Sequence, residues 1–292
     1  MDPRTILTIT ILIVALIFLL ARLIGPNLFI GFRIGYTMID ERVWKKTHEL
    51  GAVIFLISSI IYYIITIFFR DTLAMIAIFV SIMLLSTIIL LYKSIEYAEK
   101  ITGFAPTLVK EIKPLEPLKA EHADLVSYVL LIIFLIAFTY SALTLPETIA
   151  VRFDLSGNPV AWQDKTSFLI SMLTLTLTIT IVIKAVTHIG MKHPIVFYSG
   201  LIARKWGKRA LFLLTVYSLQ VSEIIITFSL LVITIYNLQS PTTTIMPTAL
   251  LITTLTIMFL IPILLIHLKR KKRPKSALTL RYGYIISAMM AF

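Results

Sequence analysis

Seven apolar stretches, each long enough to cross a bilayer, alternate with polar segments that differ sharply in lysine and arginine content. Four of these segments hold 23 of the 27 basic residues: 22–49, 93–123, 184–210 and 269–292. The other four segments, the N-terminus, 70–71, 145–166 and 236–245, hold only 1, 1, 2 and 0 basic residues. Cytoplasmic loops retain lysine and arginine, so the pattern predicts an N-terminus outside the cell and a cytoplasmic C-terminus.

Hydrophobic residues make up 58% of the chain and charged residues only 14%, a composition outside the usual range of soluble domains. A helix needs about 20 apolar residues to cross roughly 30 Å of hydrocarbon. Seven stretches meet this requirement: 5–24, 51–69, 72–92, 125–145, 168–187, 210–236 and 246–268. We therefore predict an all-α fold, a polytopic integral membrane bundle of seven transmembrane helices in the plasma membrane.

The predicted spans fall into two blocks separated by the longest polar segment, 93–123. Residues 1–92 form a three-helix block, and residues 124–268 form a four-helix block with an outer loop at 145–166. The start of segment 93–123 has helical spacing and should extend the third span, whereas its later prolines favour an extended cytoplasmic linker. A basic cytoplasmic tail occupies 269–292. The formal charge of +12 fits contact with anionic membrane lipids, and no nucleic-acid partner is predicted.

The absence of cysteine excludes disulfides, thiolate nucleophiles and cysteine metal ligands. No glycine-rich phosphate loop, nucleophile elbow or paired-aspartate motif is present, so neither an enzyme nor a cofactor is predicted. All histidines fall at the predicted cytoplasmic boundary: His48, His122, His188, His193 and His267. His48 and Glu49 do not begin an HExxH zinc-binding motif, because Ala52 stands where the second histidine is required. A metal site would need ligands from several loops, and none is predicted.

The segment 26–51 begins as a glycine-punctuated loop and turns helical from Asp40, continuing into the second span. On this helix Val43, Trp44 and Thr47 share one side. One interpretation is an amphipathic helix that seats Trp44 among the lipid headgroups. The other is a functional loop that gathers charged, polar and glycine residues: Asn27, Gly31, Arg33, Asp40 and Glu41.

The same segment resembles the motif of the SdpI family through four elements in order: Pro26 with Asn27, Gly31-x-Arg33, Trp44, and His48-x-x-Gly51. The founding member of that family is a polytopic membrane protein that protects a bacterium from its own secreted killing peptide. It is also thought to hold a transcriptional repressor at the membrane. The resemblance therefore implies an immunity, envelope-stress or signalling role, in which the chain binds a peptide outside or a regulator in the cytoplasm.

Arg33 is the leading binding candidate in this loop, because a guanidinium can bridge backbone carbonyls or an acidic group of a partner. A salt bridge to Asp40 or Glu41 that fixes the loop is the alternative.

The outer segment 145–166 contains a strong turn signal at 156–159, flanked by two short strand-like runs. These features predict a small extracytoplasmic hairpin cap. The segment resembles the domain-of-unknown-function family 1648 at six positions: Leu145, Pro146, Phe153, Gly157, Trp162 and Lys165. It departs from that family at Ala150, where a proline is expected, and at Arg152, where a histidine is expected. The last four of the six positions are binding candidates for a peptide ligand.

Glu223 lies in the middle of the sixth span, with Gln220 one helical turn before it. A carboxylate at mid-membrane costs about 2.5–3.5 kcal/mol on the insertion scale, so a functional role is the default interpretation. Glu223 is either a proton or cation site, or a structural group bonded to threonine or tyrosine. The alternative function for the whole chain is accordingly a proton- or cation-coupled transporter centred on Glu223, although no internal repeat is evident.

Overall fold

A computed structural model describes eight stretches of the chain: 2–27, 29–38, 40–69, 71–102, 117–120, 122–154, 158–198 and 208–238. The helices of this part are α1 (Pro3–Ile24), α2 (Glu41–Thr66), α3 (Thr72–Thr102), α4 (Ala123–Thr144), α5 (Lys165–Lys192), the short η2 (Pro194–Tyr198) and α7 (Lys208–Leu238). Among the described residues, six helices are long and apolar enough to cross a membrane. The predicted seventh span, 246–268, and the basic tail, 269–292, lie outside them.

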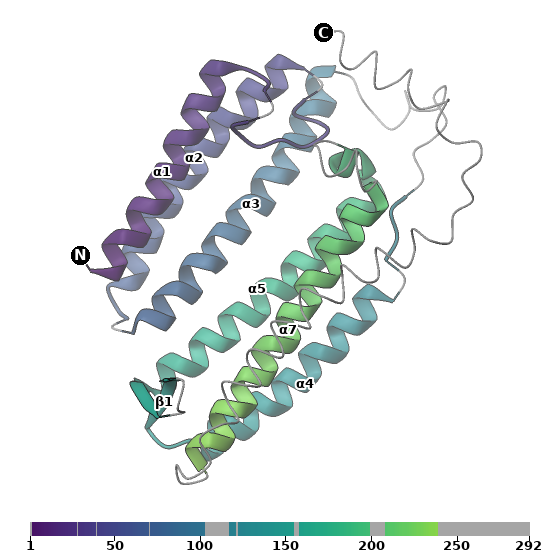
Figure 1. Cartoon of the computed structure of the whole chain (residues 1–292). Coiled ribbons are helices and arrows are strands. Elements are labelled where there is room, and N and C mark those ends of the chain that lie inside the picture. The colour runs from purple at the N-terminus through teal and green to yellow at the C-terminus, as the bar shows by residue number, and fades with distance from the viewer. Residues whose placement is uncertain are drawn as a thin grey trace.

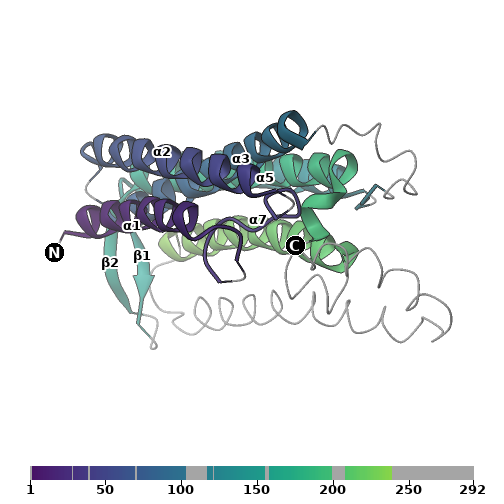
Figure 2. The ribbon, with the colours of Figure 1, turned by 90° about the horizontal axis from the view of Figure 1, so that it is seen from above.

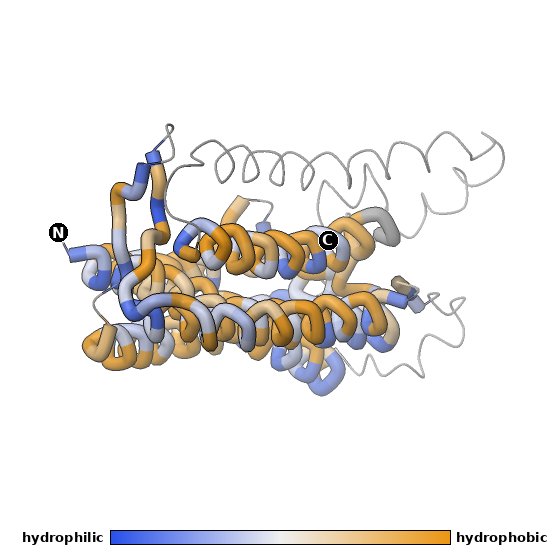
Figure 3. Tube along the Cα trace, turned by 90° about the horizontal axis from the view of Figure 1, so that it is seen from below, coloured by the Kyte–Doolittle hydropathy of each residue, from blue (hydrophilic) through white to orange (hydrophobic). Residues whose placement is uncertain are grey.

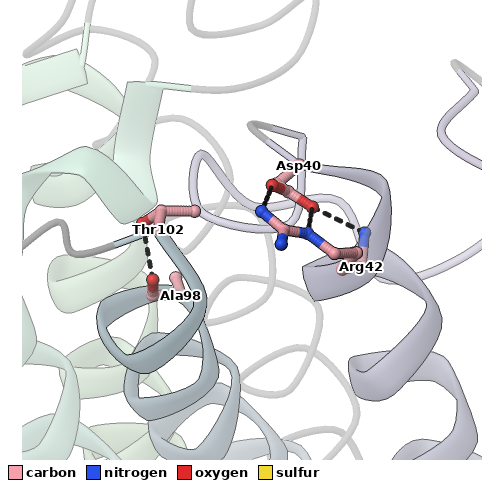
Figure 4. A network of polar contacts seen from close by, with 4 residues as sticks. All are labelled: Asp40, Arg42, Ala98 and Thr102. Carbon is pink, nitrogen blue, oxygen red and sulfur yellow. Dashed lines mark hydrogen bonds and ion pairs between the residues drawn. The ribbon is translucent and has the colours of Figure 1, made fainter.

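Two helices extend well past the apolar stretches that define their spans. The α2 helix begins ten residues before position 51, because Asp40 caps it by accepting a hydrogen bond from the Arg42 backbone N–H at 2.7 Å. The same carboxylate receives the Arg42 guanidinium, and this bond lowers the pKa of Asp40 (Figure 4). The α3 helix continues to Thr102, whose hydroxyl donates to the Ala98 carbonyl at 2.6 Å. The predicted extension of the third span is thus confirmed.

The six long helices form two groups that meet along α3 and α5 (Figure 1). The first group consists of α1, α2 and α3, and the second of α4, α5 and α7. Apolar side chains of α3, α5 and α7 share one buried cluster with residues of the loop between α1 and α2. Because helices of both groups contribute to that cluster, hydrophobic burial joins the two groups directly.

Consecutive loops lie at opposite ends of the bundle (Figures 1 and 2). The end that carries the N-terminus, the α2–α3 turn and the β-hairpin is called here the hairpin end. The other, the basic end, carries the α1–α2 loop, the last turn of α3 and η2. Hydrophobic residues predominate along the helices between the two ends (Figure 3). The described parts of the basic segments 22–49, 93–123 and 184–210 therefore lie at one end, as the alternation in the sequence predicts.

The predicted hairpin is present in segment 145–166 as two antiparallel strands, β1 (Thr148–Phe153) and β2 (Pro159–Asp164). The pairing runs from Thr148 opposite Asp164 to Phe153 opposite Pro159, with an irregularity after Ala150. Asp164 also caps α5, since its carboxylate accepts from the Ser167 backbone N–H at 2.9 Å. The strand β2 therefore leads into α5 without a loop, which fixes the hairpin against the end of the bundle.

Candidate functional site

His48 joins the loop between α1 and α2 to the first turns of α2. Its Nε2 accepts the backbone N–H of Phe32 at 2.8 Å, and its Nδ1 lies 2.8 Å from the Trp44 carbonyl oxygen. Since Nε2 accepts, the ring proton must sit on Nδ1 and be donated to Trp44. The imidazole is therefore neutral and fully buried, and it acts as a structural link between two backbone groups.

Gly31 is required by the position of that imidazole. Its φ of +106° is a conformation that other residues rarely adopt, and a Cβ built there would overlap His48 Nε2. Gly31 and His48, two residues of the SdpI-like motif, therefore pack directly against each other. A side chain at position 31 would have to displace the ring that holds the loop.

Trp44 is fully buried, so the expectation that it lies among lipid headgroups is wrong. Its indole N–H donates to the Ala21 carbonyl at 2.7 Å, and its ring centroid lies 4.0 Å from that of His48. The same carbonyl also accepts the Gly25 backbone N–H at 3.2 Å, so the indole adds a second donor at the end of α1. The Trp44 side chain therefore faces the end of α1 rather than lipid headgroups.

Asn27 closes the first turn of the loop. Its side-chain oxygen accepts the backbone N–H groups of Phe29 and Ile30 at 2.9 and 2.8 Å, and its amide donates to the Gly25 carbonyl at 2.9 Å. Asn27 thus shapes the local backbone in the manner of an Asx turn.

Arg33 is exposed at the basic end, unlike Trp44 and His48, which are buried. The two acidic residues considered as its partners both form ion pairs on their own helix: Asp40 with Arg42 at 2.8 Å and Glu41 with Lys45 at 2.7 Å. The side chain of Arg33 is therefore accessible at the basic end.

The loop also contacts the second group of helices. The Tyr36 hydroxyl lies 3.4 Å from His193 Nδ1, beyond the end of α5, and Glu99 Oε1 of α3 lies 3.5 Å from the same nitrogen. Burial lowers the pKa of His193, although Glu99 opposes this change, and burial with Glu99 raises the pKa of Tyr36 to about 12. The contact between the Tyr36 hydroxyl and His193 ties the loop to the end of α5.

The hairpin is fastened to the bundle by side chains at both of its ends. Asn237, near the end of α7, pairs with the backbone of Ala150 as a neighbouring strand would, accepting its N–H at 2.8 Å and donating to its carbonyl at 3.1 Å. Lys165 donates to the Leu145 carbonyl at 3.0 Å. The Phe153 ring packs edge-on against Tyr236, with centroids 4.4 Å apart. Phe153 and Lys165 therefore hold the hairpin in place.

Trp162 is placed differently from the other hairpin candidates, since 59% of its surface is exposed. Val160, two residues earlier on the same strand, is 49% exposed, so the two side chains form one apolar face on β2. Gly157 lies outside the described residues.

Glu223 lies halfway along α7 and is only 1% exposed. The Thr180 hydroxyl of α5 lies 2.6 Å from its Oε1, while its Oε2 is buried with no hydrogen-bond partner in the described part of the chain. Gln220, one turn earlier, donates to the Ala123 carbonyl at 2.9 Å and contacts the Ser127 hydroxyl at 3.3 Å. These contacts join α4, α5 and α7 through buried polar groups, and Glu223 faces a neighbouring helix.

The histidines within the described ranges all lie near the basic end, and His267 lies outside those ranges. In the part of the chain that the structure describes, no group of three histidine, aspartate or glutamate side chains is placed to hold a metal. Both nitrogens of His48 are already engaged with backbone groups.

Several residues that position these sites carry no motif in the sequence. Ala21 contributes only a backbone carbonyl, and Tyr36 and His193 meet across 157 residues of chain. The role of Asn237 could have been predicted from the sequence, because a lone amide at the end of an apolar span is a candidate to form hydrogen bonds with the adjoining loop. Thr180 could not be separated by pattern from the other threonines of its span.

The apolar helices define the chain as a multi-pass helical membrane protein. Residues 23–93 match the model of the SdpI/YfhL protein family, so the segment from the end of α1 to the middle of α3 is SdpI-like. The comparison gives no support for a domain 1648 segment at residues 145–165. No curated protein and no solved structure matches the chain significantly.

Proposed function

We propose that this chain is an SdpI-like protein of the plasma membrane. It binds a cationic, membrane-active peptide outside the cell and thereby protects the cell from that peptide. In this proposal the hairpin end is extracytoplasmic and the basic end is cytoplasmic. The stretch 246–268 supplies a seventh span, which places the tail 269–292 inside. The observation that carries the proposal is the exposed apolar face of Val160 and Trp162 on a hairpin fixed to the bundle.

The distribution of charge supports a cationic ligand at the hairpin end. The segments at that end hold five acidic residues: Asp2, Asp71, Glu147, Asp154 and Asp164. They hold four basic residues: Arg4, Arg70, Arg152 and Lys165. This end is therefore slightly acidic, although the whole chain carries +12. Such a surface attracts a cationic peptide, whereas the basic end would repel it.

The proposed orientation predicts which single cysteines an impermeant thiol reagent reaches in intact cells. Cysteine at position 147, where the Glu147 side chain is 88% exposed, should be labelled from outside. Cysteine at position 45, where the Lys45 side chain is 53% exposed, should be labelled only after the membrane is permeabilised. The cysteine-free chain gives no background. The reverse labelling pattern would overturn the orientation.

Protection should depend on the apolar face of the hairpin. In a sensitive bacterium challenged with a panel of cationic amphipathic peptides, the intact protein should raise the survival threshold for at least one of them. Trp162→Ala should lose most of that protection because a large exposed aromatic side chain supplies much of a contact surface, whereas Trp162→Phe should retain part of it. Tyr63→Ala, which removes an aromatic side chain of α2 that is 47% exposed, is the control. Full protection by Trp162→Ala, at equal protein level, would exclude this surface.

Arg33 is proposed to bind an acidic group of a cytoplasmic regulator, which gives the protein a signalling role. Its exposure at the basic end, beside residues buried for structure, supports this role. In the same cells, Arg33→Ala should lower protection while the protein level stays unchanged, and Lys45→Ala on the adjoining helix is the control. If Arg33→Ala keeps full resistance to every peptide, this role of Arg33 is wrong.

A further inference from the structure

The Thr180 hydroxyl has two neighbours that both require its single hydrogen. Its Oγ1 lies 3.0 Å from the Thr176 carbonyl oxygen and 2.6 Å from Glu223 Oε1. A hydroxyl carries one donor, so both contacts are hydrogen bonds at once only if the Glu223 carboxyl supplies the second hydrogen. In that arrangement Glu223 donates to Thr180, and Thr180 donates to the carbonyl one turn before it.

The surroundings of Glu223 disfavour its charged form. In the described ranges, no lysine, arginine or histidine lies within 4.0 Å of its carboxylate, and its Oε2 has no donor. A buried carboxylate without a counter-ion is strongly destabilised, and it is normally neutralised instead. A divalent cation would need six to eight oxygen ligands if it were calcium, and the cluster offers one carboxylate and threonine hydroxyls.

We propose that Glu223 is a proton-binding site in the interior of the second helix group, and that the bound proton holds α7 to α5 through Thr180. The proton is the ligand, and it neutralises the carboxyl and provides the donor that Thr180 lacks. Release of the proton would leave a buried charge with one hydrogen bond, so the contact between α5 and α7 would weaken. The site thus makes the packing of these helices sensitive to proton concentration.

Titratable groups of α4 and α5 lie between Glu223 and the basic end. Lys184 of α5 donates to the Tyr128 hydroxyl of α4 at 2.6 Å, and Thr187 donates to Asp124 at 3.2 Å. None of these groups pairs with Glu223, so none replaces the proton. These polar groups continue from Glu223 toward the basic end. In this proposal the proton on Glu223 therefore exchanges with the solvent at the basic end.

Infrared difference spectroscopy of the full chain in lipid nanodiscs tests the proposal between about pH 5 and pH 9. We expect a carbonyl band of a protonated carboxyl that persists at neutral pH, declines at alkaline pH and is absent from Glu223→Gln. Replacing sodium chloride with choline chloride should leave the band unchanged. A spectrum in which Glu223→Gln loses no such band at neutral pH overturns the proposal. A band that sodium ions abolish identifies a monovalent-cation site and also overturns it.

Two further variants keep the test decisive if Glu223→Gln folds poorly. Thr180→Val retains Glu223, and its carbonyl band should shift to the position of a carboxyl without a hydrogen bond. An unshifted band would refute the bond to Thr180. Glu147→Gln, which removes an exposed carboxyl, should leave the band intact.

The direction of proton access is tested by hydrogen–deuterium exchange of this carboxyl. Asp124→Asn should slow the exchange several-fold, while Asp154→Asn on the hairpin should leave its rate unchanged. The opposite result would show that the proton reaches Glu223 from the hairpin end.

Discussion

Gly31→Ala should lower the free energy of unfolding by about 3–5 kcal/mol, one of the two largest effects expected here. Two costs combine at this position. The backbone holds φ at +106°, which strains any residue with a Cβ, and the new methyl group would overlap His48 Nε2. Moving the ring would leave the Phe32 N–H without its acceptor at a partly buried position. Unfolding in mixed detergent micelles, followed by circular dichroism, measures the change.

Gly25→Ala is the matched control, because it separates backbone strain from the clash with His48. Gly25 also has a positive φ, +81°, but a Cβ there would meet nothing within 4 Å. We therefore expect a smaller loss, about 1–3 kcal/mol, from backbone strain alone. Equal losses for the two variants would mean that contact with His48 contributes nothing at Gly31.

Trp44→Ala should destabilise the protein by about 3–5 kcal/mol, as expected for truncation of a large, fully buried aromatic side chain. The variant leaves a cavity between α1 and α2, and it removes the indole donor from the Ala21 carbonyl, which then keeps only the Gly25 N–H. Trp44→Phe should recover part of the loss, because it refills most of the cavity but lacks the indole N–H. The same micelle-unfolding measurement applies.

Trp162→Ala provides the same chemical change at a surface that is 59% exposed. Its effect on the free energy of unfolding should stay within about 0.5–1 kcal/mol, because little packing is lost there. Truncation of Trp44 should therefore lower mainly the stability, whereas truncation of Trp162 should lower mainly the protection against peptides. If Trp44→Ala were as mild as Trp162→Ala, the indole of Trp44 would not hold α1 to α2.

The spans could be predicted because each depends on local sequence. A stretch of about 20 apolar residues is sufficient to indicate a membrane helix, and the six that lie within the described ranges are helical. The turn signal after Phe153 likewise predicted the hairpin, since turn chemistry acts over four residues. The extension of α3 to Thr102 also followed from local periodicity. These features need no knowledge of which helices are neighbours.

The role of each polar side chain depended on contacts that join distant parts of the chain. Nothing in the sequence near Trp44 shows that its indole meets the end of α1, or that His48 closes on Gly31. The sequence marked Glu223 as costly, but only the packing of α5 against α7 assigns Thr180 as its partner. Apolar length and loop charge are therefore determined by the sequence itself. Hydrogen-bond partners are decided by tertiary structure, because a buried polar group takes whichever donor or acceptor the packing brings within about 3 Å.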